Sequence, residues 1–416
     1  MPTDAARAAV GPRVRAHNVR MKTIVKASTA QDFLALVPQL VGFESEESIV
    51  FVAFRGKRSI GAMRYDLPVH ETSSAHRRIA TSLVGIVSKL PDVDAVLPVV
   101  YTAQPFAGER GMPNDEFVRL LVDRFEFSGI DVKDALCVAG DGWGSYLDES
   151  TPPGGHPLAA IRDSRIGEAI PADDRRPLGS VEEWASLPTV DLAVSERVAR
   201  RIATLAEVLH WLRAERRRDP HAAIPIGTNR SDSAPSSLGD AQIEAVLDAY
   251  LLDDLPYFVE MVFQCDPAAL PDRTAAMLIH VAQSPALRDV LLMQWAFDRE
   301  TGDRVLDDAV RFTAGEDAGA LDTSSLMMGE GPRPDPDRIE SAILIAKSLV
   351  SRAPRAHRPP LLSILAWLNW ALGRSSVAGR FVDASKAIDP HYGFAEIIET
   401  MLGRGMLPEW AFESRQ

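Results

Sequence analysis

The sequence has few cysteines and no long apolar run, and each absence limits what the chain can be. Cys137 and Cys265 are the 2 cysteines among 416 residues, too few for a disulfide framework or a structural zinc site, as in proteins of a reducing cytoplasm. No stretch holds the roughly 20 consecutive apolar residues of a membrane span. We therefore expect a soluble, cytoplasmic protein without a membrane segment.

Positive charge is in the minority. Lys and Arg number 45 against 58 Asp and Glu, which gives a net charge of -13. Such a field repels a phosphate backbone, so we do not expect nucleic acid as a partner. Residues 1–20 are an exception, because they are basic and lack the apolar segment of a signal peptide. We expect a disordered leader there, and translation could begin at Met1 or at Met21.

Familiar catalytic and metal-binding motifs are also missing. The chain contains no Walker lysine, no G-x-S-x-G elbow and no H-E-x-x-H motif. The glycines of the segment GDGWG, residues 140–144, stand between two strand-like runs and favour a hairpin turn over a phosphate loop. Cys137 lies in an apolar strand as a small core residue. We assign no catalytic residue, no metal site and no cofactor.

Strand and helix patterns alternate between Met21 and Leu147, which predicts an N-terminal α/β domain with a mixed sheet. Pro38 and Gly42 are expected to end the first helix, and Pro98 indicates an edge strand or a bulge. The predicted strands are Lys22 to Ala27, Ser48 to Phe54, Ser59 to Tyr65, Ala95 to Tyr101, Val132 to Ala139 and Trp143 to Leu147, with helices after Ser28, Ser73 and Pro113.

From Ser195 onward the apolar spacing is helical throughout, which predicts an all-α C-terminal domain. We expect the domains at 21–190, with a loop-rich end, and at 195–416, with a polar linker near 219–239. The loop-rich end is expected to hold one or two short helices, around Leu158 to Glu168 and Val181 to Ser186. After a first long helix, the predicted helices are Asp240 to Leu252, Arg273 to Gln283, Pro285 to Phe297, Arg304 to Phe312, Arg338 to Ser351, Pro360 to Leu372, Val377 to Ala387 and Phe394 to Arg404.

Four segments carry a resemblance to a known family. They are Phe33 to Ser48 (FLALVPQLVGFESEES), Arg64 to Pro68 (RYDLP), Asp134 to Tyr146 (DALCVAGDGWGSY) and the run from Pro359 to Pro408. Together they resemble the actinobacterial family called domain of unknown function 4192, over nearly the whole chain from Met21. The resemblance implies no catalytic residue, because the function of this family is uncharacterised.

The C-terminal helix pair is similar to a tetratricopeptide unit. Trp367, Leu368 and Gly373 fit its first helix, and Ala378 with either Phe381 or Val382 fits its second. No second copy follows with the same period, so we expect a single repeat-like hairpin. A surface of this kind often binds peptides, and the alternative is that the helices simply pack as core.

Polar side chains gather at the ends of several predicted strands. Arg64 and Asp66 end one strand, and Ser48 precedes the strand before it. Tyr101 ends a third strand, and the second hairpin adds the pair Trp143 and Ser145. Open α/β sheets commonly bind ligands at strand ends, so these residues are candidates for holding a polar or anionic ligand. The alternative is a structural Arg–Asp ion pair.

Two functional hypotheses follow. The first is a non-enzymatic interaction or regulatory module that binds a protein partner through its C-terminal helices, because no catalytic constellation is visible and a helical array offers partner surface. The alternative is a small-ligand-binding protein or an enzyme with a pocket at the sheet strand ends. The sequence decides neither whether the chain is an enzyme nor its oligomeric state.

Overall fold

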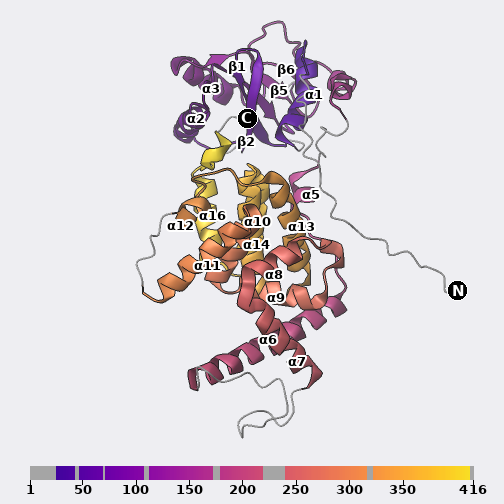
Figure 1. Cartoon of the computed structure of the whole chain (residues 1–416). Coiled ribbons are helices and arrows are strands. Elements are labelled where there is room, and N and C mark those ends of the chain that lie inside the picture. The colour runs from indigo at the N-terminus through magenta and orange to yellow at the C-terminus, as the bar shows by residue number, and fades with distance from the viewer. Residues whose placement is uncertain are drawn as a thin grey trace, which may run out of the picture.

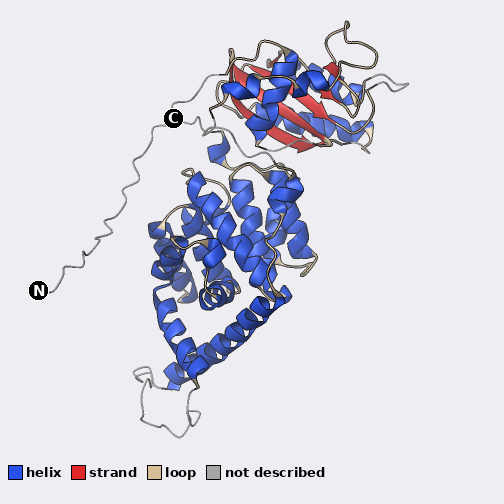
Figure 2. Cartoon of the chain, turned by 90° about the vertical axis from the view of Figure 1, so that its right-hand side faces the viewer, coloured by secondary structure: helices blue, strands red, loops and turns tan. Residues whose placement is uncertain are grey.

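The computed structural model describes residues 25–42, 46–68, 71–106, 112–171, 179–218, 239–315 and 322–412. An α/β region precedes an all-helical region, as predicted, and the two stand one above the other in Figure 1. All strands of the described residues lie in the first region, as Figure 2 shows. The expected leader at 1–20 and most of the expected linker, 219–238, lie outside the described residues.

The α/β region is built on a mixed sheet in the order β2-β1-β3-β5-β6, with β4 paired to β3. β1 runs antiparallel to β2 and to β3, β3 runs parallel to β4 and β5, and β6 is antiparallel to β5. The strands are β1 Ser48–Arg55, β2 Arg58–Asp66, β3 Ala95–Tyr101, β4 Asp131–Val132, β5 Leu136–Val138 and β6 Trp143–Ser145. Both predicted hairpins are therefore confirmed.

Helices cover both faces of this sheet and make three layers. Helices α2 (Ser73–Val87) and α3 (Asp115–Phe127) pack on the face of Phe51 and Val96. Helices α1 (Ala30–Val41) and α4 (Ala159–Arg162) cover the face of Val50 and Val99. Because β1 and β3 are buried on both faces, their sequences read as continuous apolar runs.

Pro98 corrects one prediction, because β3 is a central strand and not an edge. The carbonyl oxygen of Val96 accepts a hydrogen bond from Lys133 N at 3.0 Å, so the backbone of Pro98, two residues on, points to the same side. On that side β4 pairs with residues 95–96 and β5 with residues 99–101. Pro98 thus faces the interruption between two short strands, where no N–H donor is required.

The structure corrects part of two further predictions near the N-terminus, whereas the expected helix end at Gly42 is confirmed. Residues 25–27 form no strand, and the rest of the strand expected at 22–27 lies outside the described residues. Helix α1 continues through Pro38 and ends at Gly42, which has a φ of 92°. Gly42 N donates to the Pro38 carbonyl at 2.7 Å, so the glycine alone closes the helix.

The helices from α5 to α16 share one apolar core except for α7, which packs with the second half of α6 in a small separate cluster. Two of these helices, α8 and α12, were not predicted. The helices are α5 Val181–Ala185, α6 Leu192–Arg218, α7 Asp240–Leu251, α8 Leu255–Phe263, α9 Asp272–Ala282, α10 Pro285–Ala296, α11 Arg299–Thr313, α12 Asp322–Met327, α13 Pro336–Arg352, α14 Arg358–Ala371, α15 Ser375–Lys386 and α16 Gly393–Gly403. None of the helices in the described ranges has both the length and the apolar character to cross a membrane.

Helix α14 lies at the centre of this core, and every residue from Pro359 to Ala371 is buried. Its two tryptophans belong to the core and line no groove, because Trp367 and Trp370 are both 0% exposed. Their indole N–H groups donate to the carbonyls of Met327 and Met406 at 2.7 and 2.8 Å. Helices α14 and α15 pack together as the expected hairpin, and its tetratricopeptide character stays a prediction.

Short helix α5 belongs to the core of the helical region, although it precedes α6. Its Trp184 packs against this core, and its ring lies 4.2 Å from the guanidinium carbon of Arg374. Lys347 Nζ donates to the Trp184 carbonyl at 2.6 Å. Residues 181–185 thus pack with the second region, although we expected the first domain to extend to residue 190.

A glycine pair gives a matched test of the packing around α14. Gly329 and Gly373 have similar positive φ values of 86° and 79°. A Cβ at Gly329 would stand 2.5 Å from Trp370 Cη2, whereas nothing lies within 4 Å of a Cβ at Gly373. Both alanine variants carry a backbone penalty of about 1–2 kcal/mol, and overpacking adds about 1–3 kcal/mol in Gly329→Ala only. Urea unfolding measures the difference, and equal losses would contradict this packing.

Candidate functional site

The six predicted ligand residues lie on one face of the sheet, the face covered by α1. Strand register places Asp66, Ser48, Tyr101, Val138 and Trp143 side by side in one row across five strands. Arg64, Val50, Val99, Leu136 and Ser145 form the next row. Because directly paired residues share a face, all six candidates project to the same side.

The six residues do not meet at a single point. Neighbouring strands are about 4.8 Å apart, so Asp66 and Trp143 are separated by roughly 19 Å across the sheet. Ser48 stands directly between Asp66 and Tyr101 in the paired register. These three residues are neighbours in the register, whereas Trp143 and Ser145 stand at the far side of the sheet. We call the six residues together the sheet strip. The sequence placed the residues at one sheet end and could not supply their strand order.

Three side chains of the first row bury polar atoms without a hydrogen-bond partner among the described residues. They are Ser48 Oγ, Tyr101 Oη and Trp143 Nε1. Burial also raises the pKa of the Tyr101 phenol, so this group stays protonated and can donate. A buried donor without a partner costs about 1–3 kcal/mol. The row therefore has unused hydrogen-bonding capacity, which a polar ligand or a water molecule could satisfy.

Arg64, next to this row, makes several bonds within the protein. Its guanidinium pairs with Asp66 at 2.6 Å and donates to the Glu46 carbonyl at 3.0 Å. It also donates to Ser376 Oγ of α15, which links β2 to the helical region. The Arg64 side chain is 11% exposed and that of Asp66 is 80% exposed. Both residues thus have a structural role, the alternative that the sequence left open.

The far end of the strip is held by local contacts. The Trp143 ring packs against the His156 ring with centroids 4.6 Å apart and a tilt of 35° between the ring planes. Ser145 Oγ donates to Asp134 Oδ1 at 2.5 Å, and Leu147 N donates to Ser145 Oγ at 3.0 Å. Ser145 is therefore satisfied within its own hairpin, and it contributes less to a ligand site than the sequence indicated.

The hairpin glycines serve packing. Residues 140–142 form the turn between β5 and β6, and a Cβ at Gly142 would stand 2.6 Å from the Gly154 carbonyl oxygen. No helix begins at this turn, so free helical amides do not face a phosphate there. Glycine at this position is explained by the close approach of two backbones.

Nucleophile and metal chemistry find little support in the described residues. Burial raises the pKa of the Cys137 thiol to about 11, so the reactive thiolate is scarce at neutral pH. No group of three or more potential metal ligands occurs in the described ranges. Two carboxylates that stand two residues apart in the sequence both have protein partners. Asp92 pairs with Arg55 at 2.7 Å, and Asp94 accepts a hydrogen bond from Gly56 N at 2.5 Å.

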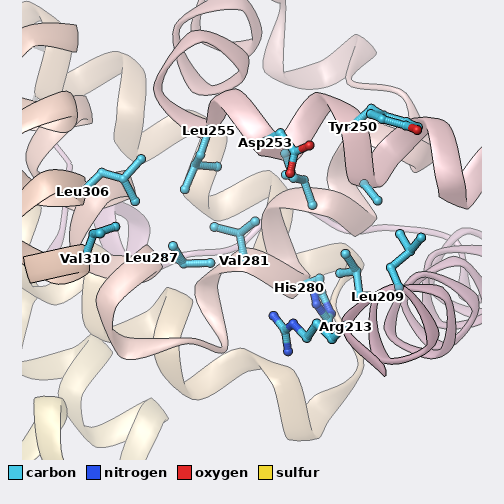
Figure 3. Close-up of a pocket in the computed structure, with 13 residues that line it drawn as sticks. Leu209, Arg213, Tyr250, Asp253, Leu255, His280, Val281, Leu287, Leu306 and Val310 are labelled. Carbon is cyan, nitrogen blue, oxygen red and sulfur yellow. The ribbon is translucent and has the colours of Figure 1, made fainter. Parts of the chain in front are cut away.

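The helical region contains a groove that the sequence did not reveal. Its volume is about 370 Å³, and Figure 3 shows Leu306 and Val310 on one side with Leu209, Arg213 and His280 on the other. Burial and the neighbouring Arg213 lower the pKa of His280, so its ring is neutral at pH 7. The lining residues are Leu209, Leu212, Arg213, Ala249, Tyr250, Leu252, Asp253, Leu255, His280, Val281, Leu287, Leu306 and Val310.

Helix α7 extends this groove with an apolar face that nothing in the described structure covers. One side packs Ala245, Val246 and Ala249 against α6. The other side exposes Ile243, Leu247, Tyr250 and Leu251 at helical spacing, with Leu247 44% and Tyr250 39% exposed. We call these four residues the α7 stripe. Because α7 has apolar residues on two faces, its apolar spacing does not distinguish a buried face from an exposed one. The sequence therefore predicted a helix here but not an exposed apolar face.

Comparison with known proteins gives a family but no activity. No curated protein and no solved structure matches the chain. The sequence model of one family, domain of unknown function 4192 (DUF4192), matches residues 31–409. This match spans the sheet strip and the helical groove and agrees with the resemblance seen in the sequence. The chain belongs to the DUF4192 family.

Proposed function

We propose that the chain is a non-enzymatic interaction module whose helical region binds an amphipathic helix of a partner protein. The observation that carries this proposal is the α7 stripe, whose residues Ile243, Leu247 and Tyr250 are spaced at i, i+4 and i+7. Tyr250 also lines the groove, so the stripe and the groove form one surface. An apolar row of this spacing matches the seam by which one helix docks on another.

The charges around this surface favour a partner helix with basic flanks. Asp240 lies one turn before the stripe, Asp253 lines the groove, and Asp307 adjoins the lining residue Leu306. Arg213 is the one permanent cation among the lining residues, and the whole chain carries a net charge of -13. Basic flanks would gain from this field, whereas a second copy of the chain would be repelled.

A designed peptide tests the proposal with the full chain. We expect a basic amphipathic helix of about 20 residues, with leucines at i, i+4 and i+7 between lysines, to bind saturably in fluorescence polarisation. Leu247→Ser and Tyr250→Ser should weaken binding about tenfold, because each removes apolar area worth about 1.5–3 kcal/mol. Leu344→Ser is the matched control, since Leu344 on α13 is 58% exposed outside this surface.

The same experiment separates apolar docking from simple charge attraction. A peptide with glutamates in place of the lysines should bind at least about tenfold more weakly. The proposal is wrong if both stripe variants bind the basic peptide like the unaltered chain. It is also wrong if the chain forms a dimer that Leu247→Ser abolishes, because the stripe would then be a self-association surface.

A second candidate function is small-ligand binding at the sheet strip, which the unpartnered atoms of Ser48 and Tyr101 favour. These two residues are adjacent in the strand register, and their oxygens are buried without a partner in the described residues. A ligand with a hydroxyl, amide or carboxylate group would satisfy both. In a thermal-shift screen of polar metabolites, a stabilising compound should lose its effect in Ser48→Ala and Tyr101→Phe, and a shift that persists in both variants would exclude the strip.

Removing the unpartnered hydroxyl should not destabilise the unliganded chain. We expect Tyr101→Phe to raise the free energy of unfolding by about 1 kcal/mol, because it deletes a desolvated donor. Tyr146→Phe is the matched control, since the Tyr146 hydroxyl is buried and donates to the Pro113 carbonyl, and it should cost about 1 kcal/mol. Urea unfolding measures both, and a loss in Tyr101→Phe equal to that of the control would contradict this account of the strip.

A further inference from the structure

A shallow hollow on the outer side of α2 and α3 gathers three arginines. These two helices lie side by side on one face of the sheet, away from the strip (Figure 1). Arg77 and Arg78 come from α2, and Arg124 reaches in from α3. The remaining lining residues all carry hydroxyl groups, and they are Ser74, Thr81 and Ser82.

The residues that line this hollow supply positive charge and no carboxylate. None of its six lining residues is acidic, and Arg77 and Arg78 form no ion pair within the described residues. The chain as a whole has a net charge of -13, so this hollow is a local site of positive charge on an acidic protein. Exposed arginines without carboxylate partners keep their N–H donors available for an anion.

One arginine of the hollow is held in place by its neighbours. Arg124 Nη1 donates to Thr81 Oγ1 at 2.8 Å, and Thr81 Oγ1 donates in turn to the Arg77 carbonyl at 2.8 Å. This chain of bonds uses one N–H of Arg124 and leaves its others for a ligand. A guanidinium fixed in this way loses less conformational entropy when an anion binds.

We propose that this hollow binds the phosphate group of a small phosphorylated molecule. A phosphate monoester carries nearly two negative charges and three acceptor oxygens, which suits several guanidinium forks and nearby hydroxyl donors. A nucleic acid would need more contacts, because specific binders neutralise about 6–10 phosphates and the field of this chain opposes a polyanion. The proposal concerns a surface of the α/β region and does not depend on the partner helix proposed for the helical region.

Calorimetric titration of the full chain with glycerol phosphate, pyrophosphate and inorganic phosphate tests the site. We expect saturable binding in the sub-millimolar range for at least one of them. Arg78→Gln and Arg124→Gln should each weaken it about tenfold or more, because each removes charge-assisted hydrogen bonds. Arg58→Gln is the matched control, since Arg58 is an exposed arginine of the hairpin between β1 and β2, and its affinity should stay within about twofold.

Three results would overturn the proposal of a phosphate site. These results are no saturable binding by the unaltered chain, equal affinities in the Arg58 and Arg78 variants, or tighter binding to a short DNA duplex or a phosphopeptide than to any small phosphate. Circular dichroism of every variant checks the fold. Ser82→Ala provides a milder variant that removes one hydroxyl and retains all three arginines, and it should weaken binding measurably without changing the thermal midpoint.

Discussion

The helical region depends on one constraint, the complete burial of α14. A helix that is apolar on all sides must be enclosed on all sides, so its neighbours are obliged to surround it. Helices α13, α15 and α16 contact it directly, and Trp410 beyond α16 donates its indole N–H to the Ala371 carbonyl at 3.1 Å. Polar side chains of α14 bond to the backbone of the same helix, since Asn369 donates to the Leu365 carbonyl at 2.8 Å and Ser363 to the Pro359 carbonyl at 3.0 Å. The shape of the region follows from this enclosure.

Much of the fold was predictable because hydrophobic spacing reports it directly. Alternating and continuous apolar runs gave both hairpins, and spacing of three and four residues gave the long helices. Pro98 could not be placed in a central strand from sequence, because its tolerance there depends on a break between β4 and β5. Helix α8 was missed for a related reason, since its 9 residues follow α7 after only a 3₁₀ turn, Leu252–Asp254.

The candidate sites were predictable only in part. Strand-end reasoning placed Ser48, Tyr101 and Asp66 at one end of the sheet, and the register makes them neighbours there. Such placement is accessible from sequence because it follows from the direction of each strand. It could not show that Arg64 reaches α15, because that contact depends on how two regions meet. The helical groove and the α7 stripe were invisible for another reason. Their residues come from separate helices, and an exposed apolar side chain reads like a buried one in a sequence.

The bond between Arg64 and Ser376 has a mechanical consequence. One guanidinium belongs to β2 and also contacts α15, so a rotation of one region against the other would break a charge-assisted bond. Such a bond contributes about 1.5–3 kcal/mol, which would make an opened arrangement at least about tenfold rarer than the closed one. The bond thus favours the closed arrangement of sheet and helices, and a motion that moves β2 away from α15 has to release this arginine.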